Sequence, residues 1–438
     1  MKQAQIVKID QIYELIQSND EIVVGMAANE PQLFMKNLHT VANRVESVTV
    51  TNCLPITDAD FFTNEAFKNS FFLDSWFYNK SLRKASKHGN ISFIPNHLHF
   101  AGKKRLDYKK PKLFITAATP PDKHGYMSLS TSNVYEKEMV EHAEIVVFEI
   151  NPNFPRTFGD MEVHVRDVDY LVEANYPVPT LPNIEPNEKD MKIGQLIADY
   201  IHDGDNIQLG IGGIPNAVAK SLIHKKDLGI HTEMFTSGMI DLIEAGVITG
   251  KKKSLHKGKH VCCFAMGSKE VYDYIDNNPS VMILPGSYVN DPAVMGLNDN
   301  QVSINSTIEV DLTGQCCSES VGTSQISGTG GQADTAIGAQ NAKNGRSFIS
   351  LYSTTSIKNR ETGEIEEVSK IVPTLKPGAA VSLSRNDVDY VVTEYGIVHL
   401  RGRNLRERAE LLISIAHPKF RDELRKQAIE AGYLYERV

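Results

Sequence analysis

The 438-residue sequence has few cysteines, and it lacks the spacings in which cysteines usually bind metals or form disulfides. Its five cysteines are Cys53 and two adjacent pairs, Cys262-Cys263 and Cys316-Cys317. Adjacent cysteines are poorly placed to bridge each other, and there is no Cys-x-x-Cys motif. The fourteen histidines do not show the paired helical spacing of a metal site. We therefore predict buried, reduced cysteines and no metal centre.

The sequence also lacks a strong net charge and long apolar runs. A net charge of −8 and a pI near 6.0 create no field that would attract nucleic acid or an anionic membrane surface. No run of about 18 apolar residues is present, and no apolar stretch follows a basic start at the amino terminus. We therefore predict a cytoplasmic protein that binds neither nucleic acid nor membranes.

The length and the hydrophobic content of 41% suit two α/β domains of roughly 200 residues each. In the second half, apolar residues with helical spacing between Ile193 and Ile201 are followed by a short strand at 206–209. A glycine-rich turn then leads to Pro215, which we expect to be the first residue of a helix. This order predicts a β-loop-α unit.

The amino terminus repeats this plan. A helical pattern around Ile12 precedes a strand at 22–24, then Gly25, a second helical pattern around Phe34, and a strand at 48–51 that matches 230–233. We infer a duplicated architecture, with domains at residues 1–182 and 183–438 and the boundary in a proline-rich stretch.

Further β-branched runs predict strands in both halves, and they lie at 113–117, 145–150, 281–284, 348–351 and 388–392. The fold class that fits best is α/β, with two related open, mostly parallel domains whose sheets are flanked by helices. The carboxy-terminal segment 405–431 predicts a charged amphipathic helix.

The first candidate site combines the turn Gly210-Ile211-Gly212-Gly213-Ile214-Pro215 with Glu233 in the next strand-like run. Helix amino termini offer free N–H groups to anions, and ligands of open parallel sheets bind beyond the carboxyl ends of the strands. Structural roles are the alternatives: the glycines can permit a tight bend or close helix packing, and Glu233 can be a capping or ion-paired carboxylate. The spacing alone leaves both possibilities open.

A second glycine cluster, residues 327–334, includes Gly330 and Gly331 and could direct backbone N–H groups toward a developing oxyanion. Asn305, after the short apolar run 302–304, could donate its amide to a carbonyl group. On composition, an ordinary loop and a harmless turn residue remain equally valid interpretations.

Read together, several motifs resemble one family. They are Pro121-Asp122-Lys123-His124-Gly125-Tyr126, Asn151-Pro152-Asn153-Phe154-Pro155-Arg156-Thr157, the Gly210–Pro215 turn, Thr232-Glu233-Met234, Asn305-Ser306-Thr307-Ile308-Glu309-Val310-Asp311, Gly328-Thr329-Gly330-Gly331-Gln332, and the run 393–402. In this order they resemble the acetyl-CoA hydrolase/transferase family of class I coenzyme A transferases, and especially its 4-hydroxybutyrate and butyryl-CoA:acetate members. The resemblance extends over nearly the full chain and implies the NagB/RpiA/CoA-transferase-like fold.

The resemblance also implies roles for individual residues. Glu233 takes the position of the family's nucleophilic glutamate, and Asn305 that of an asparagine near the thioester. Gly330 and Gly331 lie in the loop whose backbone N–H stabilises the oxyanion. The residues implied to contact coenzyme A are Gly210, Gly212, Gly213, Ile214 and Pro215. One departure stands out: many relatives have Gly-Asp-Phe where this chain has Ala333-Asp334-Thr335, which implies a differently shaped acyl pocket.

The implied activity is transfer of coenzyme A between a short-chain acyl-CoA (acetyl-, butyryl- or 4-hydroxybutyryl-CoA) and a free carboxylate such as acetate. It would proceed by ping-pong chemistry through an acyl-glutamyl anhydride and a glutamyl-CoA thioester. Coenzyme A is then a substrate, no cofactor is tightly bound, and a homodimer or higher homo-oligomer is expected. The alternatives are an acyl-CoA hydrolase and, from another class, a non-catalytic sensor of phosphorylated metabolites. A nicotinamide dehydrogenase fits less well, since Gly-x-Gly-Gly-x-Pro departs from Gly-x-Gly-x-x-Gly.

Overall fold

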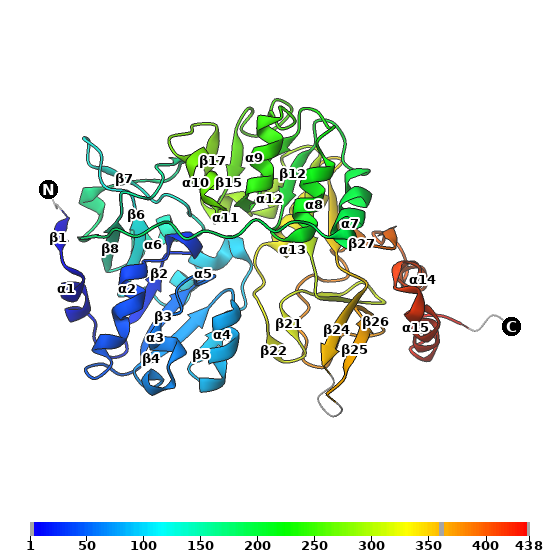
Figure 1. The fold of residues 1–438 in the computed structure, drawn as a ribbon, viewed down its shortest axis with the longest axis horizontal. Helices are drawn as coiled ribbons and strands as arrows, with labels where there is room; N and C mark the ends of the chain where they lie inside the picture. The colour runs from blue at the N-terminus through cyan, green and yellow to red at the C-terminus, as the bar shows by residue number, and fades with distance from the viewer. Residues whose placement is uncertain (1–3, 359–362, 436–438) are drawn as a thin grey trace.

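The protein contains two parallel sheets, one from each half of the chain (Figure 1). The computed structural model describes residues 4–358 and 363–435. The first sheet has the order β1 (Gln5–Val7), β11 (Tyr170–Glu173), β8 (Ile145–Ile150), β6 (Leu113–Ala118), β2 (Glu21–Val24), β3 (Val48–Asn52), β4 (Phe71–Ser75) and β5 (Ile91–Phe93). The second has the order β13 (Gly229–Ile230), β12 (Asn206–Leu209), β18 (Gln301–Ser306), β23 (Arg346–Ser350), β27 (Tyr390–Thr393) and β28 (Gly396–His399). Only the β27–β28 pair within these two sheets is antiparallel, so the predicted α/β class with mostly parallel sheets is confirmed.

Helices and smaller sheets surround these two sheets. The helices of the first half are α1 (Ile9–Glu14), α2 (Gln32–Asn37), α3 (Asp60–Thr63), α4 (Lys80–Ala85), α5 (Ala101–Tyr108) and α6 (Glu136–His142). Those of the second half are α7 (Glu188–Ala198), α8 (Gly213–Ser221), α9 (Ser237–Glu244), α10 (Lys269–Ile275), α11 (Gly286–Val289), α12 (Pro292–Met295), α13 (Gln332–Asn341), α14 (Leu405–Ile415) and α15 (Pro418–Glu430). The smaller strands are β7 (Tyr126–Ser128), β10 (Glu162–His164), β19 (Glu309–Asp311), β20 (Cys316–Cys317), β21 (Ser320–Val321), β22 (Ser324–Gln325), β24 (Thr354–Lys358), β25 (Ile365–Ser369) and β26 (Ile371–Val372).

The duplicated architecture is visible in the strand order. The run β3-β2-β6-β8-β11 in the first sheet corresponds to β13-β12-β18-β23-β27 in the second. Residue pairing follows the same register, because Ile22 pairs with Leu113 in the first sheet and Ile207 pairs with Val302 in the second. Gly25 and Gly210 then occupy equivalent places after their strands. The five central strands are therefore built twice on one plan.

The same register corrects the sequence match between β3 and the run around Glu233. Glu21 pairs with Thr49 and its equivalent Asn206 pairs with Gly229, so Thr49 corresponds to Gly229. Counting onward, the counterpart of Glu233 is Cys53 and not Thr51. The sequence match missed this shift because a shift of two residues keeps every side chain on the same face of a strand, so alternation along the sequence does not distinguish the two registers.

Three local predictions need correction. Helix α8 begins at Gly213, so Pro215 is its third residue; a proline fits there because the first four helix N–H groups have no partner within the helix. The run 230–235 is not one strand, since β13 pairs with β12 whereas β14 (Met234–Phe235) pairs with β16 (Phe264–Ala265). The predicted helix 405–431 is broken between α14 and α15, where Pro418 cannot continue the preceding helix.

The two halves share one core. Strand β9 (Phe158–Gly159), from the first half, pairs with β17 (Val281–Ile283), which pairs with β15 (His260–Cys262). One buried hydrophobic cluster also contains residues from both halves, including Phe148 and Phe235. All five cysteines are buried and free, as predicted. In the described part of the chain, no helix has the length and apolar character needed to cross a membrane.

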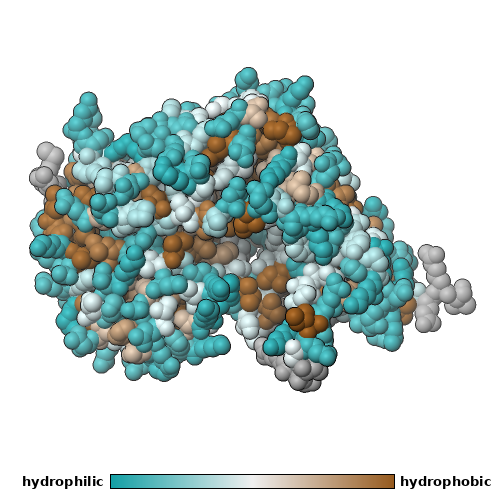
Figure 2. Space-filling view, in the orientation of Figure 1, coloured by the Kyte–Doolittle hydropathy of each residue, from teal (hydrophilic) through white to brown (hydrophobic). Residues whose placement is uncertain are grey.

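The space-filling view shows a notch in the molecular surface between the first half and the lobe that carries β21 and β22 (Figure 2). Hydrophobic side chains lie on its rim.

Candidate active site

A cavity of about 250 Å³ lies between the two halves of the protein. Six of the residues predicted to form the site line it, namely Gly210, Pro215, Glu233, Asn305, Gly330 and Gly331. Gly212 lines an adjoining groove, which shares Ile211 with the cavity. Gly213 and Ile214 lie in the first turn of α8. The tertiary structure thus brings together segments that are more than 100 residues apart in the sequence.

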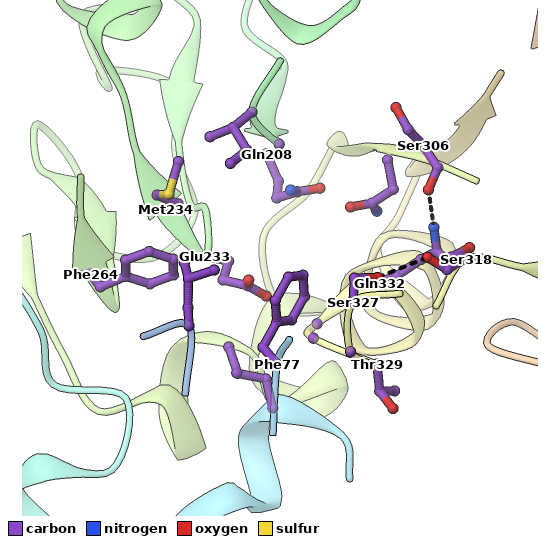
Figure 3. Close-up of a pocket in the computed structure, with 18 of the residues that line it drawn as sticks. Phe77, Gln208, Glu233, Met234, Phe264, Ser306, Ser318, Ser327, Thr329 and Gln332 are labelled. Atoms are coloured by element: carbon purple, nitrogen blue, oxygen red, sulfur yellow. Dashed lines mark hydrogen bonds between the residues drawn. The ribbon is translucent and has the colours of Figure 1, made fainter. Parts of the chain in front are cut away.

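Glu233 lies where the chain leaves the six-stranded sheet, between β13 and β14. Its backbone carbonyl accepts hydrogen bonds from the backbone N–H groups of Cys263 at 3.0 Å and Phe264 at 3.2 Å. Both contacts hold the peptide group that follows Glu233. Figure 3 shows the Glu233 side chain extending toward Phe77 of the first half, in the centre of the cavity.

The Glu233 carboxylate is held on one side. The Nδ2 atom of Asn290 donates a hydrogen bond of 2.7 Å to Oε2, and the backbone N–H of Gly331 donates another to the same carboxylate. Asn290 is fully buried and its Oδ1 faces the thiol of Cys263, with an Sγ to Oδ1 distance of 3.7 Å. The nucleophile predicted from sequence is therefore oriented and not free to rotate.

Burial raises the pKa of Glu233 to about 7. The hydrogen bond from Asn290 opposes this rise, the negative charge of Asp334 adds to it, and the Gly331 N–H opposes it. A carboxyl group with a pKa near neutrality is more basic than an ordinary glutamate, and so is a better nucleophile once ionised. Thus the site has the electrostatics expected of a reacting carboxylate.

The glycine loop 328–331 approaches Glu233 closely because it has no side chains there. A Cβ atom on Gly331 would overlap Oε2 of Glu233 and Nδ2 of Asn290, and one on Gly328 would overlap Trp76 and Phe77. Gly330 has a φ of +54°, a conformation that favours glycine. These positions therefore require glycine for two separate reasons, contact distance and backbone conformation.

The first half of the chain anchors this loop. The backbone N–H groups of Tyr78 and Leu98 donate to the carbonyls of Ser327 and Gly330, both at 3.1 Å. His99 binds Asp334 in α13 through its backbone N–H at 3.1 Å and its Nδ1 at 2.8 Å. The loop that contacts Glu233 is thus positioned by the other half of the molecule.

The amino terminus of α8 has no side-chain cap. Gly212, its N-cap residue, has a φ of +116°, and the helix continues for nine residues from Gly213. Pro215 offers no N–H, and the N–H of Asn216 donates to the Gly212 carbonyl at 3.1 Å. An uncapped helix start of this kind favours an anionic group. Gly213 packs against the carboxylate of Asp190, so helix packing also accounts for that glycine.

Asn305 belongs to a polar network on the side of the cavity that the second half forms. Its Nδ2 lies 3.0 Å from Ser303 Oγ and 2.9 Å from Thr335 Oγ1. Thr335 is almost fully buried and does not face the cavity, so the departure at position 335 acts on the orientation of Asn305 and not directly on the cavity wall. Gln332 continues the network by donating to the carbonyl of Ser306 at 2.7 Å (Figure 3).

Sequence reasoning missed two features of the site. Asn290 follows no motif that suggests chemistry, and only the fold brings it to Glu233. The wall from the first half, comprising Met26, Cys53, Leu54, Phe77 and Leu98, was also missed. With the correct register between the two copies, Cys53 would have been recognised as the residue equivalent to Glu233. In the described residues, no group of three or more His, Cys, Asp or Glu side chains could hold a metal ion.

Comparison with known proteins identifies the class. Residues 3–182 match the acetyl-CoA hydrolase/transferase N-terminal domain, and residues 267–428 match the acetyl-CoA hydrolase/transferase C-terminal domain. The chain belongs to this family, as its motifs indicated.

Individual relatives narrow the class. A succinyl-CoA:cyclohexane-1-carboxylate CoA transferase from Geobacter metallireducens is 42% identical over 94% of this chain and 92% of its own length. A 4-hydroxybutyrate coenzyme A transferase from Clostridium kluyveri is 41% identical over 96% of both chains. Proteins named acetyl-CoA hydrolase also match, but at 26% and 28% identity. The crystal structure of RipA from Yersinia pestis superimposes with a TM-score of 0.89 over 98% of both chains, at 33% identity. The prediction of a coenzyme A transferase is therefore confirmed at the level of the enzyme class.

Proposed function

We propose that the protein moves coenzyme A between a short-chain acyl-CoA and a free carboxylate, with Glu233 as the covalent nucleophile. The observation that carries the proposal is the position of the Glu233 carboxylate, which faces the cavity between the two halves while Asn290 donates to its Oε2 atom and the Gly331 N–H donates to the same carboxylate. The relatives that share more than 40% identity are named as coenzyme A transferases, which supports the same activity.

The reaction begins with attack of the free Glu233 oxygen on the acyl carbon of the thioester. The resulting tetrahedral oxyanion collapses, the carbon–sulfur bond breaks, and coenzyme A leaves as a thiolate, which gives an acyl-glutamyl anhydride. The thiolate then attacks Cδ of Glu233, the carbon–oxygen bond to the acyl group breaks, and the first carboxylate leaves. A glutamyl-CoA thioester remains, and a second carboxylate reverses these steps to form the new acyl-CoA.

The donors around Glu233 suit the second of these attacks. When the thiolate adds to Cδ, negative charge develops on the glutamyl carbonyl oxygen, and Asn290 and Gly331 already donate hydrogen bonds to this carboxyl group. Donors placed before the charge develops need no reorganisation, and so they lower the barrier. Asn305 serves the other oxyanion, on the substrate carbonyl, after its carboxamide turns so that Nδ2 faces the cavity and the hydroxyls of Ser303 and Thr335 donate to Oδ1.

Coenzyme A is a substrate in this scheme, not a bound cofactor. The uncapped start of α8, with Gly210, Gly212, Gly213, Ile214 and Pro215, would receive a negatively charged part of the nucleotide. Binding energy along the nucleotide and pantetheine is then available at the distant thioester. We retain the division into domains at residues 1–182 and 183–438, the homo-oligomeric assembly and the cytoplasmic location as predictions.

The test is to trap the intermediate. We expect incubation with acetyl-CoA to add the mass of coenzyme A to a peptide containing Glu233, and borohydride to inactivate the enzyme only after that incubation, because a thioester is readily reduced. Glu233→Gln should form no adduct. Equal borohydride sensitivity without acyl-CoA would contradict the thioester.

The same preparation separates the alternative activities. A hydrolase would release thiol from acetyl-CoA equally fast with and without acetate or butyrate as acceptor. A non-catalytic sensor would bind coenzyme A and give no turnover, and turnover retained in Glu233→Ala would remove Glu233 from the mechanism.

A further inference from the structure

The cavity beside Glu233 has two chemically different walls. The wall from the second half contains backbone and polar side chains, including Asn305, Ser306, Ser318 and Gln332. The other wall comes mainly from the first half and is apolar; with Met234 and Phe264 it belongs to the buried core (Figure 3). Figure 3 shows Met234 and Phe264 on one side of Glu233 and Ser306, Ser318 and Gln332 on the other.

The two walls divide the substrate. The uncapped start of α8 adjoins the cavity through Gly210 and Ile211, so the nucleotide end of an acyl-CoA is expected on that side. The acyl group lies on the far side of the thioester carbonyl from the pantetheine. With the carbonyl at Glu233, an acyl chain that extends away from the α8 start can contact the first-half residues Met26, Cys53, Leu54, Phe77 and Leu98.

This wall offers nothing that would stabilise a second charge. None of the described residues that line the cavity is lysine, arginine or histidine. The ionisable side chains among them are Glu233 and Cys53, and burial raises the pKa of the Cys53 thiol well above its ordinary value, so the thiol stays neutral. A second substrate carboxylate would therefore be buried without a counterion and close to Glu233, which is strongly unfavourable.

A terminal hydroxyl on the acyl chain would also find few partners there. The side chains of Met26, Leu54, Phe77 and Leu98 cannot form strong hydrogen bonds, and the Cys53 thiol is a weak donor. An apolar pocket discriminates against an added hydroxyl less strongly than against a charge.

We propose that the apolar wall of Met26, Cys53, Leu54, Phe77 and Leu98 selects monocarboxylic acids with unsubstituted alkyl chains over hydroxy acids and dicarboxylic acids of the same size. This inference rests on the proposed transferase function and names the substrate class of the same site. The expected preference differs from the acyl groups that appear in the names of two relatives, succinyl-CoA and 4-hydroxybutyrate.

Pairs of acceptors with the same shape test the proposal in the unmodified protein, with acetyl-CoA as donor. Pentanoate and 4-hydroxybutyrate differ only by a terminal methyl or hydroxyl, and we expect kcat/KM to favour pentanoate by about 10- to 100-fold. For 4-methylpentanoate against succinate, which has a carboxylate in place of the isopropyl end, we expect roughly a thousandfold preference.

The result that overturns the proposal is succinate or 4-hydroxybutyrate reacting as well as its alkyl counterpart. In that case the coenzyme A adduct on Glu233 would still form from acetyl-CoA, so the transferase function would stand. Failure to form any adduct would instead remove the proposed function itself.

A variant locates the selective wall. Met26→Gln keeps the length of the side chain and adds an amide, so it should reduce the preference for pentanoate over 4-hydroxybutyrate at least about fivefold. Met26→Leu, the apolar control, should preserve that preference. An unchanged ratio in a folded Met26→Gln enzyme would place the acyl chain away from this wall and overturn the assignment.

Discussion

The two copies of the repeated unit use equivalent positions in opposite ways. After its central strand, the second copy has an uncapped helix start at α8 and a carboxylate, Glu233, that faces the cavity. In the first copy the corresponding helix, α2, donates hydrogen bonds to an internal carboxylate: the N–H groups of Leu33 and Phe34 donate to Glu149 at 3.2 and 2.6 Å. The residue of the first copy that corresponds to Glu233 is Cys53, whose thiol is neutral.

The difference lies in what each copy presents at these positions. Glu149 fills the anion position of α2 from within the protein and also accepts a hydrogen bond of 2.7 Å from the hydroxyl of Tyr176. At α8 no side chain caps the helix start, and the Asp190 carboxylate packs against Gly213. The first copy thus contributes a closed, apolar wall, whereas the second contributes the charged group and the open helix end.

The largest effect is expected from removing the carboxylate that only the second copy has at this position. Glu233→Gln replaces the nucleophile with a neutral amide, so transfer activity should fall by at least about 10,000-fold while coenzyme A binding is retained. Single-turnover kinetics and calorimetric binding measure the two quantities. The matched control is Glu149→Gln, which removes the buried carboxylate of the other copy and should keep most of the activity. Near-normal transfer by Glu233→Gln would end the assignment.

A smaller loss of activity is expected when Glu233 is kept and the hydrogen bond from Asn290 to its carboxylate is removed. Asn290→Ala should lower kcat by about a hundredfold, the usual effect of removing one oxyanion donor. Because the Asn290 hydrogen bond lowers the pKa of Glu233, its loss should raise that pKa further.

The pH profile distinguishes this role from general damage to the fold. Wild-type kcat/KM should fall about tenfold per pH unit below pH 7, because the protonated carboxyl is not nucleophilic. In Asn290→Ala this decline should begin at a higher pH. Asn298→Ala removes a buried asparagine that binds His231 and does not contact Glu233, so its decline should begin where the wild-type one does. An unshifted profile in Asn290→Ala would contradict the positioning role.

The third change tests the close approach of the glycine loop. Gly331→Ala should reduce kcat by roughly tenfold to a hundredfold, since the added methyl group would displace Glu233 or Asn290 from its present position. Gly238→Ala, in the first turn of α9, places its new Cβ 3.1 Å from that of Ala219 and should be tolerated. Steady-state kinetics of the two variants would show whether contact at Gly331 matters more than the substitution of a glycine as such.

The smallest effect concerns stability and involves the first copy. Burial raises the pKa of Glu149 to about 7, so the folded protein holds this proton more tightly than the unfolded chain. The corresponding contribution to stability is complete below pH 4.5 and is lost as the pH rises through 7. The unfolding free energy of the wild type should therefore fall between pH 5 and pH 8. In Glu149→Gln, which has no carboxyl group to ionise there, this fall should be about 2 kcal/mol smaller. Denaturant titrations at several pH values measure this, and parallel pH dependences would contradict it.

The spacing of apolar residues and the positions of glycine and proline predicted many of the strands and helices. The alternation of apolar runs with glycine and proline turns located β6, β8, β12 and β23 and the helices α1, α2, α7 and α8, because these signals are local. The duplication was also evident, although its register was two residues off at β3. Motifs shared with known transferases pointed to Glu233, Asn305 and the glycine loop.

The sequence by itself determined the class of fold, the duplicated plan and the chemical groups available, since these depend on residue types and on short-range spacing. Only the tertiary structure decided which groups meet. Asn290 reaches Glu233 because the chain leaves β13 for a second small sheet, and Cys53 and Leu98 reach the cavity because the two halves share one core. Such contacts join residues far apart in the chain, and their distances depend on the packing of the whole protein, which no local pattern encodes.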